Sequence, residues 1–383
     1  MQEHRKHVDW VNVSFLVLTP VFAVAGAAWY TAVNGWFWQD LALCAVMYIA
    51  TGISITAGYH RYYSHRTYEC SKPVQLFWLL FGAAAVENSA LCWCSDHRDH
   101  HRYVDSEKDP YDIMKGIFWA HMGWIFYKNQ PRFDNAPDLK ADPLVQWQHR
   151  WYLAITTGIG LGIPLIVGLM TGRIWGAILW GGLVRLVLCH HGTFLINSAA
   201  HAFGRQPYST SDTSRDNPFL AIFTFGEGYH NFHHSFPADY RNGVRWYHWD
   251  PSKWLILVLR QFGQTWRLST IPDRAIARAK MEMDTTNAAA HLEQHPIEWR
   301  ENLMRKLADG RKRLDAALAR LSEMSHKHRL WSKDAHIHAI PVRERLKTGW
   351  ARKLRRARIA VDLARARYAA VRRDLFAARL EAA

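Results

Sequence analysis

The most restrictive feature of the sequence is a long apolar stretch without any basic residue, between Lys6 and Arg61. A helix needs about 20 mostly apolar residues to cross the hydrocarbon core of a bilayer. Two segments of that length fit before Arg61, and two more follow residue 150. The sequence therefore predicts an all-α fold, an integral membrane bundle of four transmembrane helices. The predicted spans are residues 13–33, 41–59, 151–170 and 174–196.

The basic residues around these spans predict their orientation. Lys6 precedes the first span, whereas the connection 34–40 between the first two spans contains no lysine or arginine. Cytoplasmic loops of membrane proteins carry an excess of these two residues. We therefore expect both termini, residues 60–150 and everything after Gly204 to lie on the cytoplasmic side, where the helices that do not span would form a cap.

Two apolar segments contain charged residues. Arg185 lies inside the fourth span, where a charge is costly, so we expect either a partner within the bundle or a shifted span. The stretch 73–93 contains Glu87 and Asn88. We therefore expect this stretch to form one helix that lies on the membrane surface or packs on the cytoplasmic side, and not a fifth span.

The C-terminal third of the chain differs in composition from the rest. Residues 261–383 contain 27 Lys and Arg against 14 Asp and Glu, so they carry +13 of the formal net charge of +15. We predict two domains, a transmembrane domain with the chemistry (1–260) and a basic helical cytoplasmic tail (261–383). Two helices are expected in the tail, 298–325 and 343–383, with a break at Pro341.

Histidine is the unusual residue of this sequence, because it occurs 22 times and nine of the histidines lie in spaced clusters. An HxxxxH pair begins at His60, HxxHH motifs begin at His97 and His230, and His201 follows Asn197 by four residues. Residues at i, i+3 and i+4 share one helix face at ~100° per residue, so we expect HxxHH to aim three imidazoles at one point. The nine clustered histidines are His60, His65, His97, His100, His101, His201, His230, His233 and His234.

The HxxxxH spacing predicts a different local structure. On a continuous α-helix, two residues that are five positions apart lie ~140° from each other around the helix axis. We therefore expect the second span to end near His60, and a turn to bring His65 round to the same point.

Nine imidazoles are too many for one zinc ion, which is typically tetrahedral. They suit two metal ions with four or five protein ligands each, but imidazole binds iron, zinc, copper and nickel alike. The isolated histidines are expected to be ordinary surface or hydrogen-bonded residues, and so are His190 and His191 inside the fourth span. The isolated ones are His7, His121, His149, His248, His291 and His338.

Five carboxylates lie near the clusters in the sequence, where they could orient the imidazole N–H groups. A solvated charge or a helix cap is an equally good interpretation for each of them. The five are Asp96, Asp99, Asp105, Asp109 and Glu227.

Four segments around the histidines resemble the stearoyl-CoA (delta-9 acyl-CoA) desaturase family, and the similarity covers roughly residues 10–260. The resemblance implies a di-iron site in which the nine clustered histidines bind two iron ions and Asn197 reaches one of them through a water. It also implies an oxidoreductase that inserts a cis delta-9 double bond into a saturated acyl-CoA, or into another acyl thioester or lipid. The four segments are residues 56–68, 96–101, 197–201 and 226–237.

Desaturation breaks an unactivated C–H bond, which needs an iron–oxygen oxidant made from O2 and two electrons. The electrons are expected from a separate donor of the ferredoxin, rubredoxin or cytochrome b5 type. The related di-iron hydroxylases, which insert oxygen with the same oxidant, are the first alternative. A membrane metal-binding or transport protein is the second, but its ligands would lie within the spans, whereas these histidines cluster at span ends.

The resemblance also implies substrate contacts. Asn88 and Lys128 match residues that contact the substrate in the animal enzymes, whereas Ser95 and Asn129 replace basic residues that help bind the CoA head group there. Tyr48 lies in the region that closes the far end of the acyl tunnel. The acyl carrier therefore stays open between CoA, a carrier protein and a phospholipid.

Tyr48 has two interpretations. It precedes His60 by 12 residues, which on a helix is ~18 Å deeper and ~120° from a whole number of turns. This geometry does not decide between a tunnel stop and an aromatic ring packed on a neighbouring span. A tunnel stop would favour palmitoyl over stearoyl chains.

The basic tail has three interpretations. Solvated helices that touch lipid head groups come first, because positive charge suits an anionic membrane surface. A docking site for an acidic electron donor comes second. Nucleic acid is not an expected partner, because no recognised nucleic-acid-binding module accompanies the charge.

Overall fold

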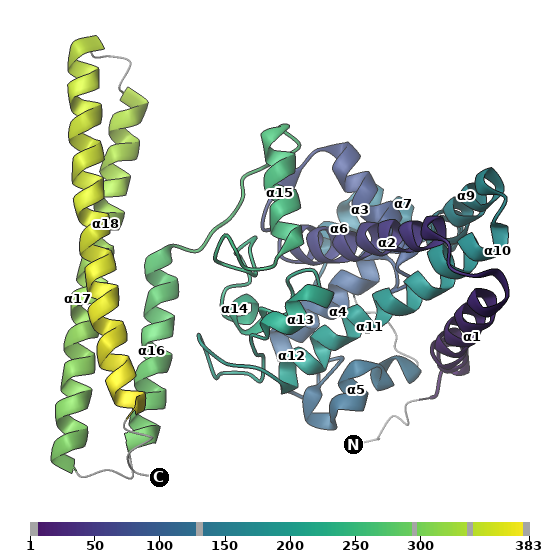
Figure 1. Cartoon of the computed structure of the whole chain (residues 1–383), viewed down its shortest axis with the longest axis horizontal. Helices are drawn as coiled ribbons and strands as arrows, with labels where there is room; N and C mark the ends of the chain where they lie inside the picture. Colours follow the sequence, from purple (N-terminus) through teal and green to yellow (C-terminus); the bar gives the residue numbers. More distant parts are fainter. Residues whose placement is uncertain (1–6, 128–132, 293–296, 335–339, 378–383) are drawn as a thin grey trace. The chain divides into compact units, whose positions relative to one another are not determined.

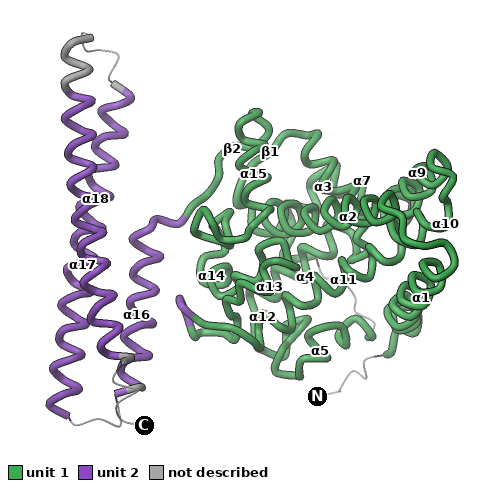
Figure 2. Tube along the Cα trace, in the orientation of Figure 1, with its two compact units in different colours: residues 1–206, 210–270 green, residues 207–209, 271–383 purple. Residues whose placement is uncertain are grey.

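The chain is almost entirely helical in the computed structural model, which describes residues 7–127, 133–292, 297–334 and 340–377 (Figure 1). Within these residues the strands are β1 (Glu69–Cys70) and β2 (Thr265–Trp266), which form one short antiparallel pair. Contacts between Cα atoms divide the chain into two compact units, residues 1–206 with 210–270 and residues 207–209 with 271–383 (Figure 2). The domain boundary predicted after residue 260 falls at the end of α15 (Pro251–Gln261), shortly before this division.

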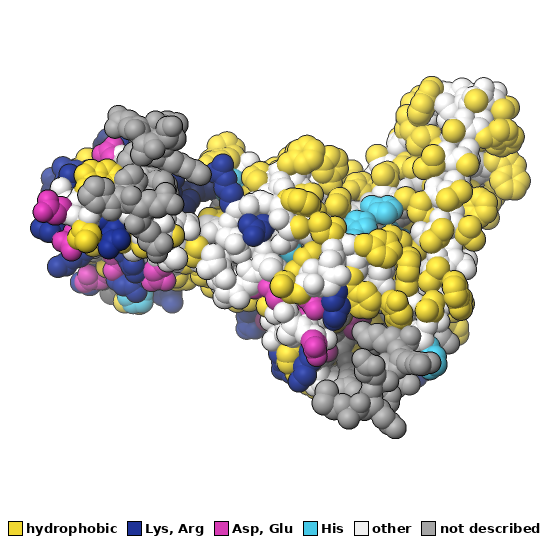
Figure 3. All heavy atoms as spheres, turned by 90° about the horizontal axis from the view of Figure 1, so that it is seen from below, with side chains coloured by type: hydrophobic (Ala, Val, Ile, Leu, Met, Phe, Trp, Pro, Cys, Tyr) yellow, Lys and Arg dark blue, Asp and Glu magenta, His cyan; other side chains and the backbone are white. Residues whose placement is uncertain are grey.

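The first unit contains four continuous helices that are long and apolar enough to cross a membrane. Apolar side chains cover their exposed surfaces and gather in the hydrophobic (yellow) part at the right of Figure 3. The predicted all-α fold with four apolar spans is therefore confirmed. The spans are α1 (Trp10–Asn34); α2 (Trp38–Ile53) continued by η1 (Ser54–Ser64); α8 (Tyr152–Thr157) continued by η4 (Gly158–Gly162) and α9 (Ile163–Thr171); and α10 (Ile174–Ala177) continued by η5 (Ile178–Val184), α11 (Arg185–Asn197) and α12 (Ala199–Ala202).

The second span continues past the point where the HxxxxH spacing predicted its end. Its last part, η1, is a π-helix that runs to Ser64, and His65 N donates to His60 O over 3.1 Å. This i→i+5 hydrogen bond places residues five apart on the same face of the helix. The predicted helix end near His60 was wrong, because the wider π turn brings His65 to the side of His60 without a turn of the chain.

The stretch 73–93 forms two helices, so the prediction of a single helix was wrong. After α3 (Lys72–Ala84), Val86 and Asn88 have left-handed φ angles of 59° and 87°. α4 (Ala90–Tyr103) then begins after Ser89, whose hydroxyl accepts a hydrogen bond from the backbone of the first turn. The break places Glu87 and Asn88 in the connection between the two helices.

Short helices form a layer that packs against η1, α11 and the start of α1. Asp9 N, just before α1, donates to Phe126 O over 2.8 Å. The N-terminal end of the first span and the C-terminal ends of the second and fourth spans therefore lie on one side of the bundle. The remaining elements of this layer are η2 (Ile113–Lys115), α5 (Ile117–His121), η3 (Gly123–Phe126), α6 (Pro137–Ala141), α7 (Pro143–Arg150), α13 (Pro218–Phe223) and α14 (His230–Ser235).

Arg185 has its partners within the bundle, which was one of the two expected outcomes. Its guanidinium donates to Ala84 O over 2.6 Å and to Gly160 O over 3.2 Å. These carbonyl oxygens lie at the end of α3 and in η4. The charge is thereby solvated by backbone dipoles, and the fourth span keeps its predicted position.

The second unit consists of three helices with an apolar core of their own. α16 (Asp273–Leu292), α17 (Ile297–Asp334) and α18 (Ile340–Ala377) pack together, and Leu307, Leu314 and Val361 are buried in their core (Figure 1). α16 was not predicted, and α17 extends beyond its predicted C-terminal end. Pro341 lies in the first turn of α18, where proline is tolerated.

Candidate metal centre

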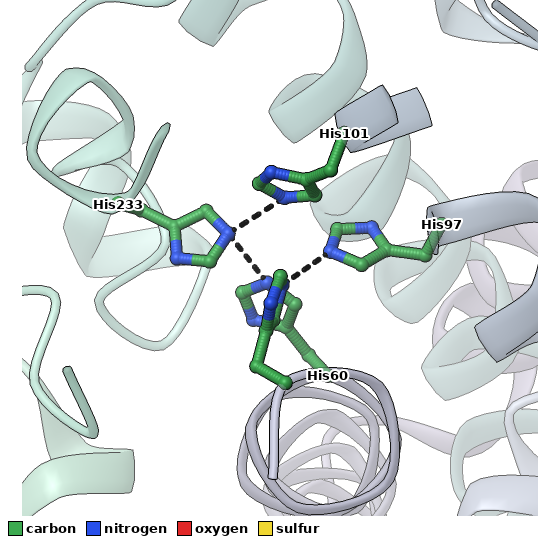
Figure 4. Close-up of side chains that lie close together, drawn as sticks. His60, His97, His101 and His233 are labelled. Atoms are coloured by element: carbon green, nitrogen blue, oxygen red, sulfur yellow. Dashed lines mark hydrogen bonds between the residues drawn. The ribbon is translucent and has the colours of Figure 1, made fainter. Parts of the chain in front are cut away.

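The nine clustered histidines meet in two groups, which accommodate every predicted histidine ligand. In each group, one ring nitrogen of every member lies within 4.8 Å of those of the others. Figure 4 labels four imidazoles of the first group, which come from η1, α4 and α14 and point toward a common centre. The first group is His60, His65, His97, His101 and His233, and the second is His100, His201, His230 and His234.

Each HxxHH helix contributes to both groups, so the prediction that it aims three imidazoles at one point was wrong. On α4 the i, i+4 pair His97 and His101 joins the first group, and the i+3 residue His100 joins the second. On α14 the i+3 residue His233 joins the first group, and the i, i+4 pair His230 and His234 joins the second. Residues i and i+4 are ~40° apart around a helix, whereas i+3 lies ~60° to the other side of i. The i, i+4 pair therefore shares one centre.

The Nε2 atoms within each group are closely spaced. His233 Nε2 lies 2.9 Å from His60 Nε2 and also 2.9 Å from His101 Nε2. In the second group, His230 Nε2 lies 3.2 Å from His234 Nε2. Metal–nitrogen bonds are ~2.0–2.1 Å long, so two nitrogens at right angles around one ion lie ~3 Å apart. The observed spacing fits a shared metal ion in each group.

Contacts at Nδ1 determine which ring nitrogen of His60 and His100 faces the centre. His60 Nδ1 lies 2.9 Å from Glu227 Oε2, and His100 Nδ1 lies 2.9 Å from the Asp109 carboxylate. A carboxylate only accepts, so Nδ1 carries the proton and Nε2 presents a lone pair to the group. His100 Nε2 is buried and has no hydrogen-bond partner among the described residues. A cation would satisfy these lone pairs, so the residues fit bound metal ions.

Burial also keeps three histidines of the first group neutral. It lowers the pKa of His97, His101 and His233 well below the ordinary histidine value, and the neighbouring imidazoles lower it further. A neutral imidazole is the form that binds a metal. The site is therefore ready for metal at neutral pH.

Glu227 connects the first group to a buried charge network. Arg61 lies 2.9 Å from Glu227 Oε1 and 2.9 Å from Asp250 Oδ1, and all three side chains are buried. Burial raises the pKa of Glu227, but His60 and Arg61 outweigh that effect, so its pKa lies below the usual glutamate value. Glu227 therefore stays ionised and holds the His60 N–H.

The other acidic candidates reach the histidines indirectly or not at all. His201 Nδ1 lies 2.9 Å from Thr213 Oγ1, whose hydroxyl donates to Asp105 Oδ1 over 2.7 Å. Asp99 accepts from an asparagine amide, and Asp96 faces a cavity. The spacing of the sequence does not reveal Thr213, because it lies in an irregular loop that has no helical spacing to His201.

A cavity of about 690 Å³ adjoins both histidine groups. His60 and His97 from the first group and His230 from the second line its wall. Apolar side chains from the spans, including Leu16 of α1 and Phe194 of α11, line it as well. A hydrocarbon chain in this cavity would therefore pass both groups.

Two of the predicted polar contacts lie in the cavity wall. Asn197 is the last residue of α11, and it lines the cavity together with His230. Asn88 lines the cavity as well, and its backbone N–H donates to the Tyr152 hydroxyl over 2.9 Å. The third predicted contact, Lys128, lies outside the described residues.

Tyr48 lines a narrow space that adjoins the cavity. Thr56 and Ile196 belong to the walls of both spaces, so the two spaces are adjacent. The Tyr48 hydroxyl donates to Phe223 O over 2.9 Å, which fixes the ring in place.

His190 and His191 of the fourth span stay outside both groups. His190 Nε2 lies 2.9 Å from Ala85 O, and His191 Nδ1 lies 3.0 Å from His121 Nε2. These contacts are ordinary hydrogen bonds between packed elements, which is the interpretation that the isolated positions favoured.

Comparisons with known proteins place the chain among lipid-modifying enzymes. The family model described as fatty acid desaturase matches residues 36–257, which contain all nine clustered histidines. The probable acyl-CoA desaturase of Schizosaccharomyces pombe is 40% identical over 282 residues, which cover 73% of this chain and 58% of that protein. Acyl-CoA desaturase 1 of Saccharomyces cerevisiae is 39% identical over 286 residues, which cover 73% of this chain and 55% of that protein.

A bacterial relative is covered more completely. The sn-1 stearoyl-lipid 9-desaturase of Anabaena variabilis is 32% identical over 263 residues, which cover 67% of this chain and 92% of that protein. The chain thus spans little more than half the length of the two yeast relatives but nearly the whole length of the bacterial one.

Proposed function

This chain belongs to the fatty acid desaturase family, and we propose that it is an oxygen-dependent acyl desaturase that inserts a cis delta-9 double bond into a saturated acyl chain. The observation that carries the proposal is one partly apolar cavity that adjoins both histidine groups. Such a cavity can hold a hydrocarbon chain in a fixed register beside a metal centre. A metal transporter would instead need ionisable ligands along a path through the spans.

Two iron ions are the proposed cofactors, one for each histidine group. When bound, they would use O2 and two electrons to oxidise an unactivated C–H bond, which side chains alone cannot do. Five histidines would hold one ion, and four histidines with Asn197, acting through a water, would hold the other. Glu227 and Asp109 keep the Nδ1 protons of His60 and His100 in place, so that Nε2 stays directed at the metal.

An acyl-CoA is the proposed substrate, since the two yeast relatives are named acyl-CoA desaturases. Asn88 would orient the polar end of the thioester from the cavity wall, and Lys128 would contact the head group. The methyl end of the chain would lie toward Tyr48. An acyl lipid is the alternative substrate, because the bacterial relative is named for a lipid.

The protein is a membrane protein with four apolar spans. We place the histidine groups and both ends of the chain on the cytoplasmic side, where CoA esters and electron carriers are found. The contact of Asp9 with Phe126 supports this arrangement, because it holds the start of α1 on the side of the histidine groups. Catalysis is assigned to residues 1–260, the basic tail to residues 261–383, and the electrons to a separate carrier.

Expression in a host without its own delta-9 desaturase tests this function. The host lipids should gain cis delta-9 chains, located by mass spectrometry of derivatised fatty acids. The His101→Ala variant should produce none, whereas the matched variant His328→Ala, in α17, should behave like the unaltered chain. Hydroxylated chains in place of alkenes would assign the protein to the hydroxylases, and expressed protein without either product would contradict the proposal.

A further inference from the structure

A row of aromatic rings leads from the surface of the first unit to Tyr229, the residue that precedes His230 of the second histidine group in the sequence. Trp246 and Tyr247 are 84% and 62% exposed, and their ring centroids lie 5.7 Å apart. The Tyr247 ring lies 5.2 Å from His248, which stacks on Tyr229 at 4.7 Å with an interplanar angle of 12°. Tyr229 is followed directly by His230. The row therefore ends at a residue that is joined to a histidine of the candidate metal centre by one peptide bond.

The loop that carries the two exposed rings is held by buried polar groups. Lys253 Nζ donates to Gly243 O over 2.7 Å and to Arg245 O over 2.8 Å, and Asp250 accepts from Gly243 N over 3.0 Å. Buried hydrogen bonds thus hold in place a loop that exposes large aromatic side chains to solvent. Exposed aromatic groups on a well-ordered segment are typical of a protein-binding surface.

The exposed charge in the segment that carries the rings is positive. Residues 241–262 contain a single acidic side chain, Asp250, which is buried against Arg61. Arg245 and Arg260 are exposed in the same segment. Such a surface complements a partner with an acidic face, which it would attract over a distance and orient.

We propose that residues 244–249, the aromatic loop, bind a small acidic one-electron carrier protein, and that its electrons enter the metal centre along the ring row. The inference rests on the proposed function, in which two electrons, two protons and the two hydrogens removed from the chain reduce one O2 to two waters. Each carrier is oxidised by one electron, so two carriers dock for each double bond. The docking surface thereby lies on the catalytic unit and not on the basic tail.

The test uses the full chain, loaded with iron, in lipid nanodiscs with two electron sources. One source is a reduced carrier, chosen from ferredoxin, rubredoxin and cytochrome b5 by the highest turnover or tightest binding. The other is dithionite-reduced methyl viologen, which needs no docking surface. Removal of both rings by Trp246→Ala with Tyr247→Ala should lower the ratio of carrier-driven to viologen-driven turnover, and weaken carrier binding, by about tenfold, as for aromatic anchors at interfaces.

Two variants make the result specific. Trp175→Ala removes a tryptophan that is 77% exposed at the opposite end of the fourth span, and it should leave the ratio and carrier binding unchanged. The single variant Trp246→Phe keeps an aromatic ring at this position and leaves Tyr247 unaltered. It should therefore retain most of the carrier binding and of the carrier-driven turnover.

Several outcomes would overturn the inference. An unchanged ratio with unchanged carrier binding would remove the loop from electron entry, and an equal loss with both electron sources would make it a structural element. Loss of lipid association with unchanged carrier binding would assign the rings to the membrane surface. Loss of carrier binding on deletion of the tail, but not in the loop variant, would move the docking site to the tail.

Carrier binding that depends on the two rings, in a chain that makes no product with viologen, would support the docking surface and contradict desaturation.

Discussion

His233 lies between two other predicted ligands of the first group, since its Nε2 lies 2.9 Å from those of both His60 and His101. His233→Ala removes one of the five proposed ligands of the first group from α14, a helix that also contributes to the second group. We expect bound iron to fall from about two ions per chain to one or fewer. Turnover should fall by more than the ~10–100-fold typical of losing an outer hydrogen bond to a ligand. Metal analysis and product formation measure both effects.

His328→Ala is the matched control, because it makes the same substitution in α17, outside both groups. Its iron content and turnover should equal those of the unaltered chain. Full activity in His233→Ala would show that the ligand assignment is wrong.

The buried histidines also predict how stability depends on pH. Burial lowers the pKa of His97, His101 and His233 well below 6.5, so the folded metal-free protein does not take up the protons that the unfolded chain binds below that pH. The free energy of unfolding should therefore fall with falling pH by about 1.4 kcal/mol per pH unit for each such histidine. Above pH ~6.5 both states are neutral, and this contribution no longer changes.

Thermal unfolding of the metal-free protein between about pH 7.5 and about pH 5.5 measures this slope. His97→Gln, which removes one of the titrating groups, should show a shallower slope. A melting temperature that stays constant over this range would contradict the prediction.

The gathering of the nine histidines could be predicted from the sequence because helical spacing fixes the direction of each side chain. Their division between two centres follows from the same ~100° per residue, once i+3 and i+4 are recognised as lying on opposite sides of i. Thr213 and Asp250 could not be predicted in the same way. They reach the histidine network from loops, whose paths depend on tertiary packing and not on local spacing.

At the level of elements, we propose that the second span limits how far an acyl chain can enter the cavity. Tyr48 on α2 lines the narrow space next to the cavity, and its hydroxyl donates to Phe223 O over 2.9 Å. Tyr48→Ala should open this space, so we expect the preference to move from palmitoyl toward longer chains. The double-bond position should not change, because the histidines are untouched. Mass spectrometry of the products measures both properties.

Tyr48→Phe separates the ring from its hydroxyl. It keeps the bulk and loses only the hydrogen bond, so the chain-length preference should stay as it was. An active Tyr48→Ala variant with an unchanged product profile would place Tyr48 outside the acyl tunnel.

The elements could be predicted where bilayer thickness sets their length, and not where a helix departs from α geometry. Side-chain hydroxyls donate to carbonyl oxygens of the π-helix η1. The Tyr68 hydroxyl donates to Ala57 O over 2.7 Å, and the Ser64 hydroxyl donates to Tyr59 O over 2.9 Å. These contacts form only in the folded chain, so the spacing from His60 to His65 suggested a turn instead.

At the level of the whole molecule, the catalytic unit should function without the tail. All nine clustered histidines precede Thr270, and the second unit has a core of its own. Truncation after Thr270 should therefore keep the iron content and viologen-driven turnover close to those of the full chain. Loss of iron binding in this variant would show that the chain does not divide in this way.

Truncation after Gln261 is the informative comparison. It also removes β2, which pairs with β1, and Ser269 N, which donates to Thr67 O over 2.7 Å. Thr67 lies three residues beyond the end of η1 and two beyond His65, so the shorter variant should have a lower melting temperature and hold iron more weakly. The two truncations thus test whether catalysis needs residues 262–270, beyond the boundary that composition alone predicted.

The charge of the tail marked it as a separate part of the chain, but its three-helix fold was only partly predictable. The buried residues of α16, such as Met281 and Ala288, are separated by polar residues and do not form a continuous apolar run in the sequence. Its place becomes clear only when α17 and α18 supply the surface that it covers.

The sharing of α4 and α14 between the two histidine groups has a consequence for the life of the protein in a cell. An ion in either group holds both helices in the orientation that the other group needs, so the first ion prepares the position of the second. Loading should therefore be cooperative, and half-filled chains should be rare. When iron is scarce, the population should then consist of fully loaded and metal-free chains. Lipid unsaturation would follow the number of fully loaded chains, and the activity of each loaded chain would stay the same.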